Sequence, residues 1–261
     1  MNSVESTSQD YPDSLRDLGD APSRLFTIGD ASHMRPPTVS IVGTRNATSY
    51  GMRTARSLAT AFSRAGFSIV SGMARGIDAA VHRAALEAGG RTVAVLGTGV
   101  DVPYPIGHRE LHRAIGERAL VISEYGSGVG AHPGTFPRRN RIIAALSPVT
   151  IVVEAGVRSG AINTAGHALR LSRTIAAVPG PIDSPQSVGA NRLIRDGAQI
   201  ITALPDAFAL AGVAMDDECE PSGLAPDEAR VWKCLAAGPL GPDALARKCH
   251  VTVRECLTIL T

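Results

Sequence analysis

Two consecutive strand–turn–helix patterns between Val39 and Asp78 constrain the fold more than any other feature of the sequence. In each, a β-branched run leads into a small-residue turn that carries one arginine, and a helical run follows. The turn residues of interest are Gly43, Thr44, Arg45, Ser71, Gly72, Arg75 and Gly76. In a parallel sheet such turns meet at one edge, where free backbone N–H groups, helix dipoles and guanidinium groups converge. The pattern predicts a phosphate-binding crevice. The alternative is that the glycines only make tight turns and the arginines are solvated.

The same alternation of strand and helix continues along the chain. We expect strands near residues 38–42, 67–70, 92–96, 120–123, 150–153, 174–178 and 198–201, with helices between most of them. This order predicts an α/β fold with a doubly wound, mostly parallel sheet.

The formal net charge of +2 conceals an uneven distribution. Residues 1–37 have a net charge of −3, residues 38–214 of +8, and residues 215–261 of −3. We expect a polar N-terminal leader that is disordered or loosely attached, an α/β domain (38–214), a linker (215–224) and a helical domain (225–261). Within residues 1–37, apolar residues such as Tyr11, Leu15 and Leu25 could form a short lid or an extra strand against the core. Because the positive excess lies in the domain with the two turns, an anionic partner is indicated.

A second arginine cluster follows the glycine-rich loop that ends at Gly134. It comprises Phe136, Arg138, Arg139, Asn140 and Arg141, at the start of a helical run. Cations at a helix N-terminus oppose the helix dipole unless an anion is bound there. An aromatic ring beside arginines suits single-stranded nucleic acid, whose phosphates contact guanidinium groups and whose bases stack on rings. The alternative is a buried Phe136 and arginines paired with Glu124 or Glu154.

Asp78 and His82 lie one turn apart on one face of the second helix. A catalytic Asp–His pair is conceivable, but we favour structural roles because no nucleophile is placed beside them.

Other classes of protein receive little support from the sequence. No signal peptide or membrane-spanning apolar run is evident, so we expect a soluble, cytoplasmic protein. The four cysteines lack metal-site spacing, and the Gly97-x-Gly99 motif is too short for a dinucleotide fingerprint. We therefore expect no metal and no cofactor.

Taken together, these motifs resemble the DNA processing protein A family (DprA, also called Smf). The resemblance covers about residues 22–210 and rests on nine motifs in order. They are IVGTR at 41–45, SGMARGID at 71–78 with His82, YP at 104–105, SE at 123–124, FPRRNRI at 136–142, VVE at 152–154, SG at 159–160 with TA at 164–165, AVPG at 177–180 and GAN at 189–191.

The resemblance implies a Rossmann-like, non-catalytic protein that binds single-stranded DNA in natural transformation. It also implies that the protein protects incoming strands, recruits RecA recombinase to them and works as a homodimer. The two glycine turns would hold backbone phosphates, the three clustered arginines and Asn140 would continue the track, and Phe136 would lie near a base. Asp78, His82, Glu124 and Glu154 would support the site structurally.

Two departures from the family pattern stand out. Only about twenty polar residues precede the matching part, so the helical N-terminal domain of many relatives is not expected. Residues 225–236, 241–248 and 252–260 resemble the helices of the family's winged-helix domain, without its β-hairpin. We expect Val231, Leu235, Leu245, Val253, Leu257 and Leu260 to form the core of this acidic, incomplete module, which favours protein contact over DNA contact.

The competing hypothesis is a nucleotide-binding enzyme similar to phosphoribohydrolases. Glu124 or Glu154 would then activate water to cleave an N-glycosidic bond. In those enzymes a glycine turn opens a helix and the glutamate follows on that helix. That motif is missing here, because Glu154 precedes the glycine turn.

Overall fold

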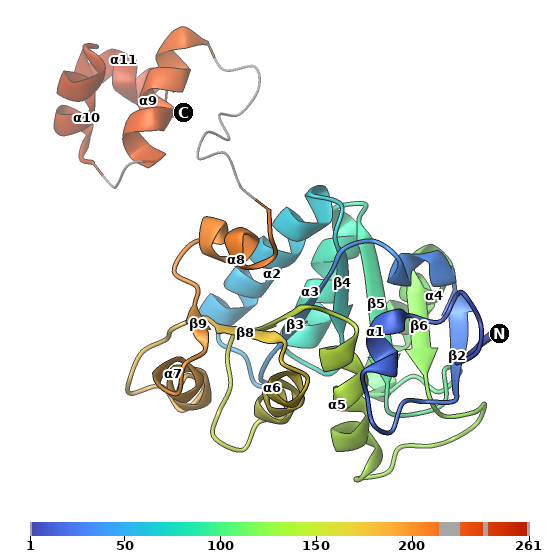
Figure 1. Ribbon diagram of the computed structural model, residues 1–261. Coiled ribbons are helices and arrows are strands. Elements are labelled where there is room, and N and C mark those ends of the chain that lie inside the picture. The colour runs from blue at the N-terminus through green and yellow to red at the C-terminus, as the bar shows by residue number, and fades with distance from the viewer. Residues whose placement is uncertain (1, 214–224, 237–239, 260–261) are drawn as a thin grey trace. The chain divides into compact units, whose positions relative to one another are not determined.

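The computed structural model describes residues 2–213, 225–236 and 240–259, which fall into two compact units divided between Ala214 and Met215. The predicted linker (215–224) lies outside the described residues. The first unit is an α/β domain and the second is a group of three helices (Figure 1).

A nine-stranded sheet forms the first unit, in the order β1-β2-β6-β5-β4-β3-β7-β8-β9. The strands are β1 (Asn2–Glu5), β2 (Arg24–Gly29), β3 (Thr38–Val42), β4 (Ser68–Ser71), β5 (Arg91–Leu96), β6 (Leu120–Ser123), β7 (Val149–Val152), β8 (Thr174–Ala177) and β9 (Gln199–Ile200). From β6 to β9 all pairings are parallel, whereas β1 and β2 are joined antiparallel. The predicted doubly wound, Rossmann-like α/β fold is confirmed.

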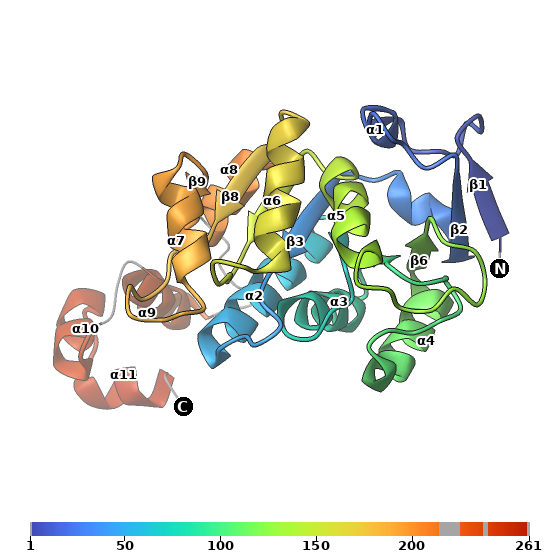
Figure 2. The same cartoon turned by 90° about the horizontal axis from the view of Figure 1, so that it is seen from below.

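Helices cover both faces of this sheet (Figures 1 and 2). One face carries α1 (Asp13–Arg16), α5 (Thr135–Ala145), α6 (Gly160–Arg170) and α7 (Val188–Arg195). The other carries α2 (Ser49–Arg64), α3 (Ile77–Glu87), α4 (Arg109–Arg118) and α8 (Leu204–Leu210), whose Phe208 stacks on Phe62 of α2. The central strands β3, β4 and β7 are buried throughout, as expected of a parallel sheet covered on both sides.

The strand order reverses direction beside β3. The chain adds β4, β5 and β6 on one side of β3 and then returns to place β7, β8 and β9 on the other. The loops after β3 and β7 therefore lead to opposite faces of the sheet and leave a space between them. This switch point is where ligands bind in open α/β sheets.

The N-terminal segment corrects the prediction of a loosely attached leader. Residues of β1 pair with β2, and β2 pairs with β6, so the segment extends the sheet. Tyr11, Leu15 and Leu25 are buried in the main core. The alternative that Tyr11, Leu15 and Leu25 belong to an extra strand or lid against the core is thus the one that the structure bears out, because a few buried side chains suffice to hold a short segment against an existing core.

Three helices form the second unit: α9 (Pro226–Ala236), α10 (Pro242–Cys249) and α11 (Val253–Ile259). Val231 and Leu245 are buried as predicted, and Leu235 packs against them. Val253 and Leu257 are exposed, contrary to the prediction, and Cys249 and Cys256 occupy the core instead. Leu260 lies outside the described residues. A cysteine behaves as a small hydrophobic residue. A periodicity of apolar residues that leaves cysteine out therefore assigns the wrong face of the helix to the core.

Candidate functional site

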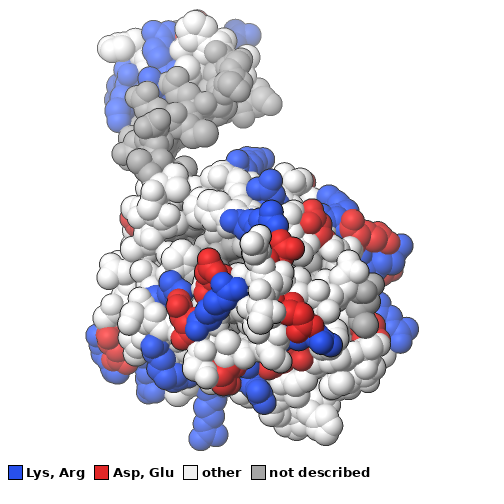
Figure 3. All heavy atoms as spheres, turned by 45° about the vertical axis from the view of Figure 1, so that its right-hand side comes forward, with Lys and Arg blue, Asp and Glu red and all other residues white. Residues whose placement is uncertain are grey.

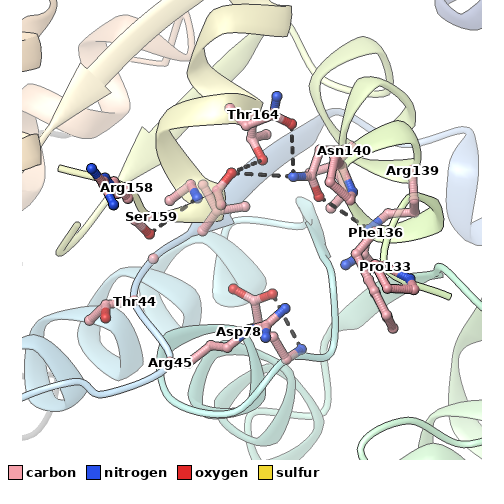
Figure 4. A pocket seen from close by; sticks show the side chains of 18 of the residues that line it. Thr44, Arg45, Asp78, Pro133, Phe136, Arg139, Asn140, Arg158, Ser159 and Thr164 are labelled. Atoms are coloured by element: carbon pink, nitrogen blue, oxygen red, sulfur yellow. Dashed lines mark hydrogen bonds between the residues drawn. The ribbon is translucent and has the colours of Figure 1, made fainter. Parts of the chain in front are cut away.

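A cavity of about 900 Å³ lies at the switch point. It is lined by residues that follow β3 (Gly43, Thr44 and Arg45), by α5 and the loop before it, and by the N-terminal part of α6. Figure 4 shows side chains from these elements directed toward one hollow. A smaller cavity of about 270 Å³ adjoins it and is lined by Arg45, Arg75, Tyr104, Phe136 and Arg139, among others. We call the two cavities together the crevice.

The two glycine turns pack against each other at the base of the crevice. The Thr44 N–H donates to the Glu154 carbonyl at 2.7 Å, and the Ile77 N–H donates to the Thr44 carbonyl at 3.3 Å. Gly76 has a φ of 74°, and a Cβ there would overlap the Thr44 carbonyl oxygen. Only glycine permits both this backbone conformation and this close approach. The turns therefore form one backbone unit, with Arg45 and Arg75 exposed on it.

Asp78 lies beneath both turns. Its carboxylate accepts hydrogen bonds from the backbone N–H groups of Gly43, Gly72 and Ala74, and so links the ends of β3 and β4. Burial raises the pKa of Asp78, while the nearby charge of Arg139 and these hydrogen bonds oppose the rise. The predicted supporting role thus has a definite geometry: one carboxylate holds two turns in register.

Arg139 crosses the floor of the crevice. Its side chain is buried, and its Nη1 donates to the Gly72 carbonyl at 2.8 Å and to the Val95 carbonyl. Burial lowers its pKa to about 10, a value at which the guanidinium is still charged at neutral pH. Arg139 therefore contributes positive potential from below and does not extend into solvent.

Three of the residues predicted to bind phosphate, Ser71, Arg138 and Arg141, do not line the crevice. The Ser71 hydroxyl is buried and donates to the Ile41 carbonyl at 2.7 Å. Arg141 is buried and donates from Nη1 to Glu124 Oε1 at 2.9 Å. Arg138 is exposed, but its nearest carboxylate is also Glu124, 3.6 Å from its Nε, and it does not line the crevice. Ion pairing with Glu124 was the alternative that the sequence left open for these arginines.

We call the ion-paired region around Arg141 the N-terminal seam. Arg141 Nε donates to Asp20 at 2.9 Å, and Arg173 pairs with Asp17 at 2.5 Å. Burial alone would lower the pKa of Arg141, but the bonds to Glu124 and Asp20 outweigh burial and raise the pKa. Acidic residues before β2 thus neutralise arginines of the sheet domain. On the face in Figure 3, acidic and basic side chains lie intermixed over much of the surface.

Glu154 and His82, two further supporting residues, are also buried in the domain. Glu154 is buried and accepts from the Thr48 N–H at 2.9 Å and from the Thr48 hydroxyl at 2.5 Å, which secures the start of α2. His82 is buried, with Nδ1 2.7 Å from the Thr92 hydroxyl, and burial lowers its pKa to about 3. No hydrogen bond between Asp78 and His82 is present in the described part of the chain.

Phe136 is half-buried and lines both cavities. Its ring centroid lies 4.9 Å from that of Tyr104, in a tilted arrangement, and the ring covers Gly97. The ring is therefore fixed on one side and faces the crevice on the other. Asn140 donates to the Gly160 carbonyl at 3.2 Å and to Asn163 Oδ1 at 3.1 Å, so it joins α5 to α6.

The structure adds residues that the sequence did not single out as site residues. Arg158, Ser159 and Asn163 line the cavity from the start of α6, and His132 and Pro133 line it from the loop before α5. The sequence predicts a helix opening at residues 159–164 that offers free N–H groups at the crevice, and Ser159 and Asn163 of this opening do line the cavity. The loop carried no such signal. Within the described residues, no set of three or more His, Cys, Asp or Glu side chains is arranged to hold a metal.

The fold and the crevice define a Rossmann-like α/β protein with an arginine-lined cavity at the topological switch point. Family models identify it further: "DNA recombination-mediator protein A" matches residues 2–211 and "DprA winged helix domain" matches residues 217–261. The chain belongs to the DNA recombination-mediator protein A family, as its motifs predicted.

Relatives and solved structures agree with this assignment. A curated relative from Mycobacterium tuberculosis that carries the DprA name is 44% identical over 199 residues, which is 76% of this chain and 51% of the relative. DNA processing protein DprA from Streptococcus pneumoniae is 41% identical over 199 residues, covering 76% of this chain and 70% of that protein. This chain thus spans about half the length of the first of these relatives.

Two solved structures share the fold. DNA processing protein A from Streptococcus pneumoniae superposes with a TM-score of 0.77 at 40% identity, over 80% of this chain and 73% of that one. DNA processing protein A from Helicobacter pylori, described for its single-stranded DNA binding mode, superposes with a TM-score of 0.72 at 30% identity, over 78% and 91% of the two chains. In the described residues of the present chain, no helix is both long and apolar enough to cross a membrane.

Proposed function

We propose that this protein binds single-stranded DNA in DNA processing during natural transformation, with the strand lying across the crevice. The observation that carries the proposal is the pair Arg45 and Arg75. Both are exposed at the junction of the two turns, and among the described residues neither has an ion-pair partner. The similar structure from Helicobacter pylori, which is described for its single-stranded DNA binding mode, supports the same ligand.

The mechanism is electrostatic and independent of base sequence. Arg45 and Arg75 contact backbone phosphates, Arg139 adds positive potential from the floor, and the start of α6 contributes its helix dipole. Each bound phosphate releases condensed counterions, so affinity falls steeply with salt. Phe136 offers a ring face on which a base can stack without regard to its identity.

We further propose that the protein binds without turnover. Support comes from the two carboxylates that the enzymatic alternative would need. Glu154 is occupied by Thr48 at the start of α2, and Glu124 by Arg141. A general base must reach the proton that it removes, and neither carboxylate lines the cavity.

In this proposal the protein acts in the cytoplasm, as a homodimer, protecting incoming strands and recruiting RecA recombinase. These finer points rest on the family resemblance alone. The recruitment of RecA can be tested directly by following RecA filament formation on single-stranded DNA with and without the protein.

The test of DNA binding is a fluorescence-anisotropy titration of a labelled single strand and its duplex at low and high salt. We expect tight, salt-sensitive binding of the single strand. Substituting Arg45→Ala together with Arg75→Ala should abolish most of it for every sequence alike. An Arg113→Ala variant, which removes an exposed arginine on α4, is the control. Unchanged affinity in the double variant would refute the proposed site.

The enzymatic alternative has its own test. Wild type and a Glu154→Gln variant are incubated with nucleoside monophosphates, and free base is measured by chromatography. We expect no release from either protein. Release by wild type that the variant does not show would contradict binding without turnover.

A further inference from the structure

A second arginine pair lies outside the crevice, on the outer surface of α2 and α3. These helices pack side by side on the sheet face opposite α5 and α6 (Figure 2). Arg53 of α2 and Arg83 of α3 are both exposed. Neither has an ion-pair partner among the residues that the structure describes.

One ion pair sets the register between the two helices. Arg56 Nη2 of α2 lies 2.7 Å from Glu87 Oε2 of α3. Arg53 precedes Arg56 by three residues, and Arg83 precedes Glu87 by four. Residues three or four apart share a helix face, so Arg53 and Arg83 oppose each other one turn closer to the crevice.

The surroundings leave this pair uncompensated. The carboxylate one turn along from Arg83 is Glu87, and Arg56 already engages it. Asp78, the other acidic residue of α3, is buried beneath the turns. Like charges across neighbouring helices disfavour the fold slightly, which makes an uncompensated pair a candidate binding feature for an anion.

The pair also continues the line of the crevice. Arg75 lies two residues before the first residue of α3, Ile77. Arg83 follows Ile77 by six residues, which places it roughly 9 Å along the helix axis from the start of α3. A DNA strand that contacts Arg75 at the rim can therefore pass onto the surface of α2 and α3 and meet the second pair.

We propose that Arg53 and Arg83 form a second phosphate subsite, which binds the backbone of the same single strand after it leaves the crevice past Arg75. The proposal rests on the proposed function, since it extends the strand bound there. It predicts that strands too short to leave the crevice do not use the subsite, whereas longer strands do.

The experiment compares oligothymidylates of about four and about sixteen nucleotides, within the usual range of single-strand site sizes. Three proteins are titrated over a series of salt concentrations: wild type, an Arg53→Gln and Arg83→Gln double variant, and a control. The control, Arg64→Gln with Arg91→Gln, removes the same charge from the end of α2 and the start of β5. Both control arginines are exposed and lie near the amino ends of the strands, whereas the crevice lies at their carboxyl ends.

We expect the double variant to bind the short strand as wild type does and to bind the long one about tenfold more weakly. Its salt slope on the long strand should fall by about 0.7 for each phosphate that is no longer bound. Equal weakening in the control, or unchanged affinity in the double variant, would overturn the subsite. Failure of wild type to bind either strand would instead overturn the proposed function, so the two failures are distinguishable.

Discussion

The crevice and the N-terminal seam use the same residue type in opposite ways. In the seam, Arg141 is buried between Glu124 and Asp20, and Arg173 pairs with Asp17. At the crevice, Arg45 and Arg75 are exposed and unpaired within the described chain. An arginine whose charge is neutralised internally stabilises the fold, whereas one left uncompensated at a concave surface is available to an anion. Substitutions in each region can test this division.

The largest effect is expected where the seam is broken. Arg141→Met leaves Glu124 buried with only the exposed Arg138 nearby, and an uncompensated buried charge costs about 3–5 kcal/mol. Urea unfolding should show this destabilisation, while single-strand affinity of the folded protein stays within about threefold of wild type. The double variant Arg141→Met, Glu124→Gln should recover much of the stability. A large drop in affinity at full stability would place Arg141 in the binding site.

The next effect concerns the contact between the two turns. Gly76→Ala should cost about 3 kcal/mol, because the new Cβ overlaps the Thr44 carbonyl oxygen and lies 2.9 Å from the carbonyl carbon of Arg45, in a backbone conformation that disfavours alanine. It should also weaken single-strand binding by displacing Arg45.

Gly89→Ala, just beyond the other end of α3, is the matched control. Its φ is 68°, but nothing lies within 4 Å of the added Cβ, so only about 1 kcal/mol of backbone strain is expected and affinity should not change. Thermal unfolding and anisotropy measure both variants. Equal effects of the two substitutions would show that the contact between the turns is not what matters.

A smaller effect should appear in the pH dependence of stability. His82 has a folded pKa of about 3 against 6.5 in the unfolded chain, so between these values the unfolded state binds the extra proton. The contribution of His82 to the free energy of unfolding is therefore fully present above pH 6.5, and it falls by about 1.4 kcal/mol per pH unit below that value. His82→Gln should flatten the profile between pH 6.5 and 5 in urea unfolding. Parallel profiles for the two proteins would show that His82 is not buried in its neutral form.

The smallest effect is expected at Arg138. Its side chain is 58% exposed and its ion pair with Glu124 is long, so Arg138→Gln should change stability by less than about 1 kcal/mol. Because the residue does not line the crevice, affinity should change by less than about threefold. A tenfold drop in affinity, measured by anisotropy, would extend the DNA track toward the seam.

Much of the fold was predictable because its signals are local. The β-branched runs and the glycine turns predicted the strands 38–42 and 120–123 at the bounds that the structure shows. The turns also predicted that Arg45 and Arg75 would meet, since parallel strands end at one edge of a sheet.

Side-chain direction and partnership were decided only by the tertiary structure. Arg138, Arg139 and Arg141 are neighbours in the sequence, yet one is exposed, one lies under the crevice and one is locked in the seam. Helical geometry turns successive residues by about 100°, so their environments depend on what packs against each face. For Arg141 that partner is Asp20, which lies 121 residues away in the N-terminal segment, and nothing in the sequence pairs the two. The sequence alone determined which strands end in glycine turns that carry an arginine. The packing of distant segments determined which arginines are ion-paired and which remain exposed at the crevice, because ion pairing depends on proximity in space.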